Sequence, residues 1–190
     1  MTMRRTLVGA FACLVALAAI GCMPKMTVED FKAMRPQRPQ ELEMLNAFVG
    51  KWQHTGTLKM SMFEDEVKTS GSNEAKWGGD GWYLVDSGTF GMGEMGEMKA
   101  TSLWAYDAKA KKFRTAWVDS MGGFGTGTVR YNKKTDTWHM TARSQTPHGT
   151  MYGKGTTKFI SDDEAEWTWS ESALFGLLKV MDMKGTTKRQ

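Results

Sequence analysis

The three histidines are the leading candidates for chemistry in this chain, and none lies close to another in the sequence. No second histidine lies two or four positions from His54, His139 or His148, which is the spacing of a zinc pair. His54 alternates with Trp52 and Leu58, so we expect it to face an interior as a hydrogen-bonded wall residue. His139 is expected to face solvent, and His148 to lie in a turn.

Methionine is the other unusual feature, with 16 in the chain, and Met92, Met95 and Met98 are evenly spaced. Thioethers are soft ligands that suit Cu(I), whereas Glu94 and Glu97 between them suit harder cations. The three methionines are therefore a candidate metal site. The alternative, which we favour, is that methionine fills irregular apolar space and that this glycine-rich stretch is an exposed hairpin loop.

Patterns typical of catalysis are absent from the sequence. There is no Gly-x-Ser-x-Gly element for a serine nucleophile. The glycine-rich stretches 79–81 and 122–127 lie between strand patterns and open no helix, so we expect them to relieve crowding at bends, not to hold phosphate. The only cysteines are Cys13 and Cys22, which leaves the body of the chain without a disulfide. We expect a protein that is not an enzyme and has no resident cofactor.

The first 22 residues predict a location. Arg4 and Arg5 precede an apolar run from Leu7 to Ile20, which is too short for a permanent membrane span and is typical of a signal peptide over residues 1–21. The ending Ala-Ile-Gly-Cys resembles a bacterial lipobox, which makes Cys22 the expected lipidation residue. The expected location is the bacterial cell envelope, lipid-anchored and facing the periplasm, with the outer membrane favoured. The alternative is an ordinary cleaved signal in which Cys22 has no role.

Charge gives little support for a polyanionic partner. The chain has 25 Lys and Arg against 21 Asp and Glu, and only Arg4 and Arg5 of these lie within residues 1–21. The remainder therefore carries a net charge of about +2. Its cations are scattered singly or in pairs, so we expect no nucleic-acid partner.

A tether and a helix precede the main domain. Residues 22–40 contain three prolines and are expected to be a flexible tether, with a short helix over 28–34. The apolar residues Leu42, Leu45 and Phe48 have helical spacing, which predicts a short helix over 41–49.

From Gly50 to Lys188 the sequence reads as about ten strands. Short alternating runs recur between turn residues, and the expected inward faces include Trp52, His54, Gly56, Leu58, Met60 and Met62, and then Trp82, Leu84 and Phe90. Two aromatic-turn-aromatic segments, 106–113 and 131–138, repeat at a distance of 25 residues, and a weaker echo covers 159–167. These are expected to be successive hairpins. The prediction is a single antiparallel up-and-down β-barrel over residues 41–188, because closure removes exposed edges.

Several segments resemble a known family. The stretch 45–52, Leu-Asn-Ala-Phe-Val-Gly-Lys-Trp, is similar to the opening of lipocalin-like (calycin) barrels. The segments 103–107 and 115–122 resemble the domain of unknown function 1579 family, a group of exported barrels. The resemblance implies the lipocalin-like fold and assigns no catalytic residue. Related haem-binding barrels use one histidine of an inner wall, which leaves haem open at His54.

A barrel of this size has room for about one small ligand. The candidate ligand-binding residues are His54, Trp104, Trp117, Met121, Met140 and Trp169, with Asp86, Arg114 and Asp119 as possible polar anchors. The expected function is non-catalytic binding of a small apolar or amphipathic molecule, in a protein held at the membrane by its lipid. The alternatives are an envelope interaction or structural module with a filled barrel, a Met-rich copper protein and, less favoured, a barrel enzyme.

Overall fold

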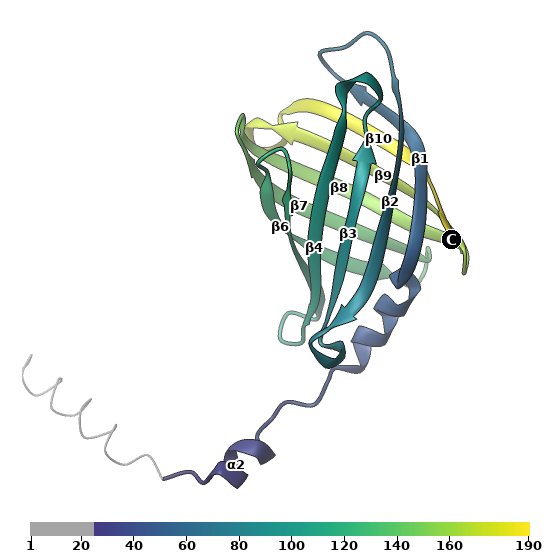
Figure 1. Cartoon of the computed structure of the whole chain (residues 1–190). Coiled ribbons are helices and arrows are strands. Elements are labelled where there is room, and N and C mark those ends of the chain that lie inside the picture. Colours follow the sequence, from purple (N-terminus) through teal and green to yellow (C-terminus); the bar gives the residue numbers. More distant parts are fainter. Residues whose placement is uncertain (1–24) are drawn as a thin grey trace, which may run out of the picture. The chain divides into compact units, whose positions relative to one another are not determined.

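The computed structural model describes residues 25–190, and most of them form a closed antiparallel β-barrel (Figure 1). The predicted signal peptide and Cys22 lie outside the described residues. Ten strands follow one another along the chain: β1 (Gly50–Met60), β2 (Val67–Gly78), β3 (Tyr83–Gly91), β4 (Glu97–Asp107), β5 (Lys112–Asp119), β6 (Phe124–Asn132), β7 (Thr137–Thr146), β8 (Gly149–Ser161), β9 (Glu164–Ala173) and β10 (Leu178–Arg189).

The strand order is that of an up-and-down barrel. Each strand pairs antiparallel with its neighbours in the sequence, and β1 pairs with β10 to close the ring. Closure pairs both edges of every strand, so the backbone of this sheet offers no free edge to another chain. The predicted all-β, ten-stranded lipocalin-like barrel is confirmed.

The repeated aromatic-turn-aromatic segments are hairpins, as predicted. Tyr106 faces Phe113 across the β4–β5 turn, and Tyr131 faces Trp138 across the β6–β7 turn. Their ring centroids are 5.2 and 5.1 Å apart, within the range of favourable aromatic pairs. The third segment spans β8 and β9, with Asp162 and Asp163 in the turn between them.

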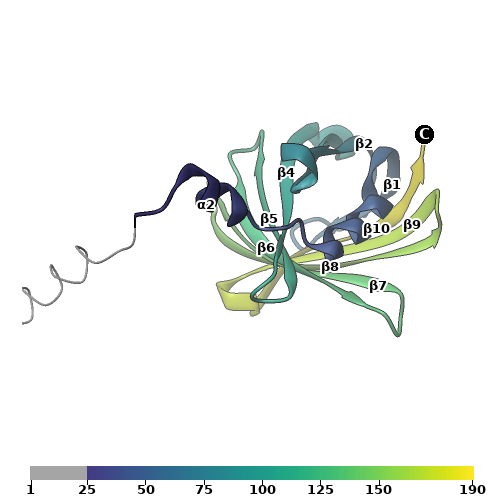
Figure 2. The same cartoon turned by 90° about the horizontal axis from the view of Figure 1, so that it is seen from below.

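The predicted helix over 41–49 is present as a 3-10 helix, η1 (Gln40–Phe48). Three residues per turn place Leu42, Leu45 and Phe48 on one side, which explains their regular spacing. Leu42 and Leu45 are fully buried, and η1 lies at one end of the barrel (Figure 2). Both belong to a cluster of buried residues, which comprises Leu42, Leu45, Ala75, Leu84, Trp104, Phe113, Val129 and Trp138.

The short helix expected within the tether is α2 (Val28–Ala33). Thr27 and Asp30 form a capping box, in which each side chain bonds the backbone N–H of the other. The unit that contains α2 ends at Gln37, and residues 38–190 form a second unit. That second unit begins where Arg38 donates a hydrogen bond from Nε to the carbonyl of Gly81 over 2.6 Å. No helix within residues 25–190 is both long enough and apolar enough to span a membrane.

Two of the predicted inward residues lie beyond the strand ends. Met62 follows β1 in a turn and is 75% exposed, and Trp82 follows the short 3-10 helix η2 (Gly79–Gly81) and is 38% exposed. Alternation along a strand applies only while the strand lasts, so both predictions were wrong. Leu58 and Leu84, within their strands, are buried as expected.

We expect η1 to stabilise the barrel by filling its end. Leu45→Ala should lower the free energy of unfolding by about 2–5 kcal/mol, because the side chain has no exposed surface and truncation leaves a cavity. Urea unfolding followed by circular dichroism measures the change. Leu177→Ala is the control, because Leu177 is 87% exposed and its truncation should change stability by no more than about 0.5 kcal/mol. Equal effects of the two substitutions would show that η1 does not seal the core.

Candidate functional site

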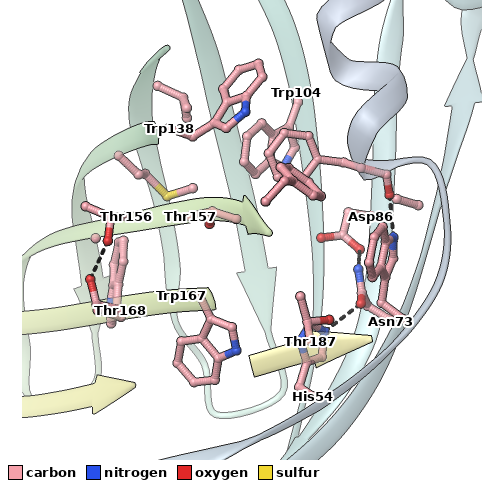
Figure 3. Close-up of a pocket in the computed structure, with 18 of the residues that line it drawn as sticks. His54, Asn73, Asp86, Trp104, Trp138, Thr156, Thr157, Trp167, Thr168 and Thr187 are labelled. Carbon is pink, nitrogen blue, oxygen red and sulfur yellow. Dashed lines mark hydrogen bonds between the residues drawn. The ribbon is translucent and has the colours of Figure 1, made fainter. Parts of the chain in front are cut away.

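The interior of the barrel contains a cavity of about 320 Å³ (Figure 3). This volume lies at the lower end of the range for small-molecule sites, about 300–1,000 Å³. The lining is largely aromatic, contributed by η1, β1, β3, β4 and β7–β9: Phe48, Trp52, Phe90, Trp104, Trp138, Phe159, Trp167 and Trp169. A cavity with such a lining suits a planar apolar molecule.

Glycines on neighbouring strands keep the tryptophans against the wall. A Cβ atom on Gly153 would stand 2.2 Å from Cζ2 of Trp169, and one on Gly155 would stand 2.6 Å from its Cε3. Gly185 has the same relation to Trp167, with a separation of 2.7 Å. Each indole therefore lies directly over backbone that carries no side chain. This arrangement leaves part of the interior open although the residues lining it are large.

A chain of three polar side chains crosses the wall of the cavity, from β1 through β2 to β3. Nε2 of His54 lies 2.6 Å from Oδ1 of Asn73, and Nδ2 of Asn73 donates to Oδ1 of Asp86 over 2.5 Å. All three residues line the cavity. Because Asp86 accepts from the amide nitrogen, Asn73 presents its carbonyl oxygen to His54. His54 must therefore carry its proton on Nε2.

Burial sets the charge of the two ends of this chain. Removal from water lowers the pKa of His54 below its ordinary value, and Asn73 and Asp86 oppose this only in part. Burial also raises the pKa of Asp86, against the hydrogen bond from Asn73 and the attraction of His54. A neutral His54 has its lone pair on Nδ1. The polar chain thus fixes which nitrogen of His54 is a donor and which is an acceptor.

A second largely buried carboxyl group, that of Glu171, lies on β9. Glu171 accepts a hydrogen bond from Nε1 of Trp169 over 3.0 Å. Burial raises its pKa above the ordinary value, and the charge of Asp119 raises it further. Trp169 therefore contributes an apolar face to the cavity while its polar edge is already bonded.

Four of the six predicted ligand-binding residues line the cavity, namely His54, Trp104, Met140 and Trp169. Trp117 and Met121 do not. Trp117 has an inward position on β5, but its indole lies over Gly125, where a Cβ would stand 2.4 Å from its ring. Met121 is 57% exposed in the β5–β6 turn.

The turn at Met121 has a clear cause. Oδ1 of Asp119 accepts hydrogen bonds from the backbone N–H groups of Met121 and Gly123, at 2.9 and 3.0 Å. This is an Asx turn, and it ends β5 before Met121 is reached. Met121 therefore does not line the cavity, and its prediction as a ligand-binding residue was wrong.

Of the three possible polar anchors, only Asp86 lies in the cavity. Arg114 faces outward and pairs with Asp107, with Nη2 and Oδ2 3.0 Å apart. Asp119 serves the turn described above. His139 is exposed and His148 lies in the β7–β8 turn, as predicted.

The evenly spaced methionines lie around the β3–β4 turn, which contains the 3-10 helix η3 (Gly93–Met95). Met95 is 38% exposed, whereas Met98 is half-buried and pairs in register with Phe90. Within residues 25–190 no group of three or more His, Cys, Asp or Glu side chains could hold a metal ion. Copper binding by the thioethers of Met92, Met95 and Met98 stays a prediction.

Haem at His54 would require a change in this structure. Nε2 of His54 is bonded to Asn73, so coordination through that nitrogen would break the polar chain. The residues present therefore do not fit an axial haem site through Nε2.

Several residues of the site were not predicted from the sequence, above all Asn73. Its strand alternates as Thr69, Gly71, Asn73 and Ala75 on one face, and Thr69 and Ala75 are buried. The alternation was available from the sequence, but small and polar residues on the inner face hid it. Thr187 also lines the cavity and was not predicted to do so. Alternation along a strand indicates which side chains face inward, but it does not show whether their polar atoms have hydrogen-bond partners.

Fold and cavity together define a lipocalin-like β-barrel with an aromatic interior. The family model described as a protein of unknown function, DUF1579, matches residues 37–183. The chain therefore belongs to the DUF1579 family, as the resemblance of its motifs indicated. A comparison with curated proteins finds no match.

Solved structures support the same fold at low sequence identity. Rv2717c from M. tuberculosis is similar with a TM-score of 0.58 and 12% identity, over 81% of this chain and 99% of that chain. The S-type phycobiliprotein lyase CPES from Guillardia theta has a TM-score of 0.55 and 11% identity, over 82% of this chain and 98% of that chain. At such identities the likeness establishes the fold alone.

The buried His54 should make stability depend on pH. The unfolded chain binds a proton at this residue below about pH 6.5, whereas the folded protein resists protonation until lower pH. The unfolded state then holds more protons, so His54 lowers the free energy of unfolding as pH falls through this window. Asp86 acts in the opposite direction, because its raised pKa lets the folded state take up a proton first.

Comparison with His54→Gln isolates the contribution of the imidazole. The stability of the wild type relative to this variant should fall between about pH 7.5 and about pH 5.5, by at most about 1.4 kcal/mol per pH unit. Urea unfolding at both pH values measures it. His139→Gln, at an exposed position on β7, should show no such trend. A difference that stays constant or grows on acidification would contradict the assignment of a neutral, buried His54.

Proposed function

We propose that this protein binds one small, largely apolar molecule inside its barrel and does not transform it. The observation that carries the proposal is the cavity of about 320 Å³, whose wall combines aromatic rings with one short polar chain. Ligand sites are typically apolar with a few placed polar groups. A plain packed core has neither the open volume nor a reason to bury His54 and Asp86.

The distribution of packing within the barrel supports this proposal. The end near η1 is filled by a cluster of buried residues that includes Leu45, Phe113 and Val129. The cavity borders that cluster, and five residues belong to both: Ala75, Leu84, Trp104, Val129 and Trp138. One end of the interior thus supplies stability, while the rest remains available to a ligand.

We also propose that the protein acts at the bacterial cell envelope as a lipoprotein facing the periplasm. The support is the sequence of residues 1–22, with its paired arginines, apolar run and terminal cysteine. A lipid at Cys22 would hold the barrel at a membrane, where apolar molecules concentrate. Mass spectrometry of the protein from bacterial membranes tests this, since a diacylated N-terminal Cys22 is the expected result. An unmodified chain that begins elsewhere would refute it.

The second candidate is an envelope interaction module whose barrel is filled. The filled end around η1 is the observation that favours it. The two functions differ in one measurable property, because only a barrel with an open interior takes up an apolar probe.

Uptake of the fluorescent probe N-phenylnaphthylamine by the full-length chain distinguishes the two candidate functions. We expect saturable binding with enhanced fluorescence in the wild type. Met140→Trp should weaken binding at least about tenfold, since Met140 lines the cavity and the larger side chain fills it. His139→Trp is the matched control, because the adjacent side chain is exposed. Absence of binding to the wild type, or equal binding by both variants, would favour the filled-barrel module.

A further inference from the structure

The cavity contains a hydrogen-bond donor that the protein does not use. Nε1 of Trp167 is buried and has no hydrogen-bond partner within residues 25–190, and the same holds for Oγ1 of Thr187. Both residues line the cavity. Buried polar groups in folded proteins almost always have a partner, so two unpaired ones in the same cavity call for an explanation.

Three of the other four tryptophans that line the cavity differ from Trp167 in this respect. Nε1 of Trp169 donates to Glu171, that of Trp104 to Ser102, and that of Trp52 to the carbonyl of Phe48. These bonds have lengths of 3.0, 3.0 and 2.8 Å, respectively. The buried, unpaired indole N–H of Trp167 therefore contrasts with the bonded indoles of these three residues.

The two unpaired groups lie in one corner of the cavity, beside the polar chain. Thr187 on β10 faces His54 on β1 directly, and Gly185, two residues before it, faces Trp167 on β9. The rings of His54 and Trp167 meet edge to face, with centroids 6.5 Å apart. Figure 3 shows the indole nitrogen of Trp167 on the side of its ring that faces Thr187 and His54.

The charge of this corner restricts the ligand further. None of the described residues that line the cavity is Lys or Arg, and burial keeps His54 neutral. A carboxylate would therefore be buried without a cation, near the carboxyl group of Asp86, which is unfavourable. A neutral oxygen can accept hydrogen bonds here without that cost.

We propose that the corner beside His54 where Trp167 and Thr187 lie recognises a neutral carbonyl oxygen, so that the ligand is a planar aromatic ketone, a quinone or a compound of similar chemistry. The oxygen accepts from Nε1 of Trp167 and Oγ1 of Thr187, and the planar body lies against the aromatic wall. This inference rests on the proposed function, because it names the kind of molecule that the barrel binds.

A pair of ligands with the same shape tests the inference on the full-length chain. Methyl naphthyl ketone and isopropenylnaphthalene differ in having an oxygen or a methylene group at one position, and each displaces N-phenylnaphthylamine if it enters the cavity. The wild type should bind the ketone about two- to tenfold more tightly, as expected for one added hydrogen bond to a buried donor. The naphthoate anion should bind more weakly than the ketone.

Variants identify the side chains that cause the preference for the ketone. Trp167→Phe and Thr187→Val each remove a donor while retaining an apolar side chain, and each should reduce the preference for the ketone, with Trp167→Phe abolishing most of it. Trp169→Phe is the matched control, because its indole nitrogen is already bonded to Glu171. It should weaken both ligands alike and keep the preference.

The outcomes separate this inference from the function on which it rests. Binding of both ligands with equal affinity to the wild type overturns the carbonyl site and leaves apolar binding intact, and this comparison needs no variant to fold. A preference that survives Trp167→Phe, or naphthoate binding more tightly than the ketone, overturns it as well. If neither naphthalene compound displaces the probe and the probe itself does not bind, the proposed function fails.

Discussion

Pairing of the first strand with the last is the interaction on which the rest of this structure depends. Nine residue pairs, from Trp52 with Arg189 to Met60 with Met181, join β1 to β10 and close the sheet. Arg189 reinforces the closure, because its guanidinium lies 4.2 Å from the ring of Trp52 and its Nε donates to Asp163 over 3.0 Å. Without the pairing of β1 with β10 the cavity would be open along one wall, and His54 would not lie beside Thr187.

Closure also explains why the interior is hollow where it is. A ten-stranded ring encloses more space than one layer of side chains fills, unless another element enters. At one end η1 enters and supplies Leu42 and Leu45 to the core. Further along, Trp167 and Trp169 lie against glycines of the neighbouring strands and leave the centre open. Tryptophan side chains thus pack in the core cluster near η1, whereas further along the barrel they lie against the wall because glycines stand beside them.

Much of the fold could be predicted from the sequence because its signals are local. Alternation with period two identifies strands, and the repeated segments at 106–113 and 131–138 identify hairpins, since turn and flanking aromatics lie within a few residues. The predicted site was less accurate where it depended on strand ends. Met121 keeps the inward alternation of β5, but Asp119 ends that strand two residues earlier by bonding the turn backbone.

The polar part of the site was beyond prediction from the sequence for a different reason. His54, Asn73 and Asp86 come from three strands, and Trp167 and Thr187 come from two more, so their meeting depends on the register of each hairpin and on closure. A shift of one residue in any pairing would turn a member of the group outward. The sequence therefore indicates an aromatic interior, whereas only the closed barrel brings a neutral imidazole and two free donors together. It is that convergence, and not the aromatic content, which distinguishes a binding site from a core.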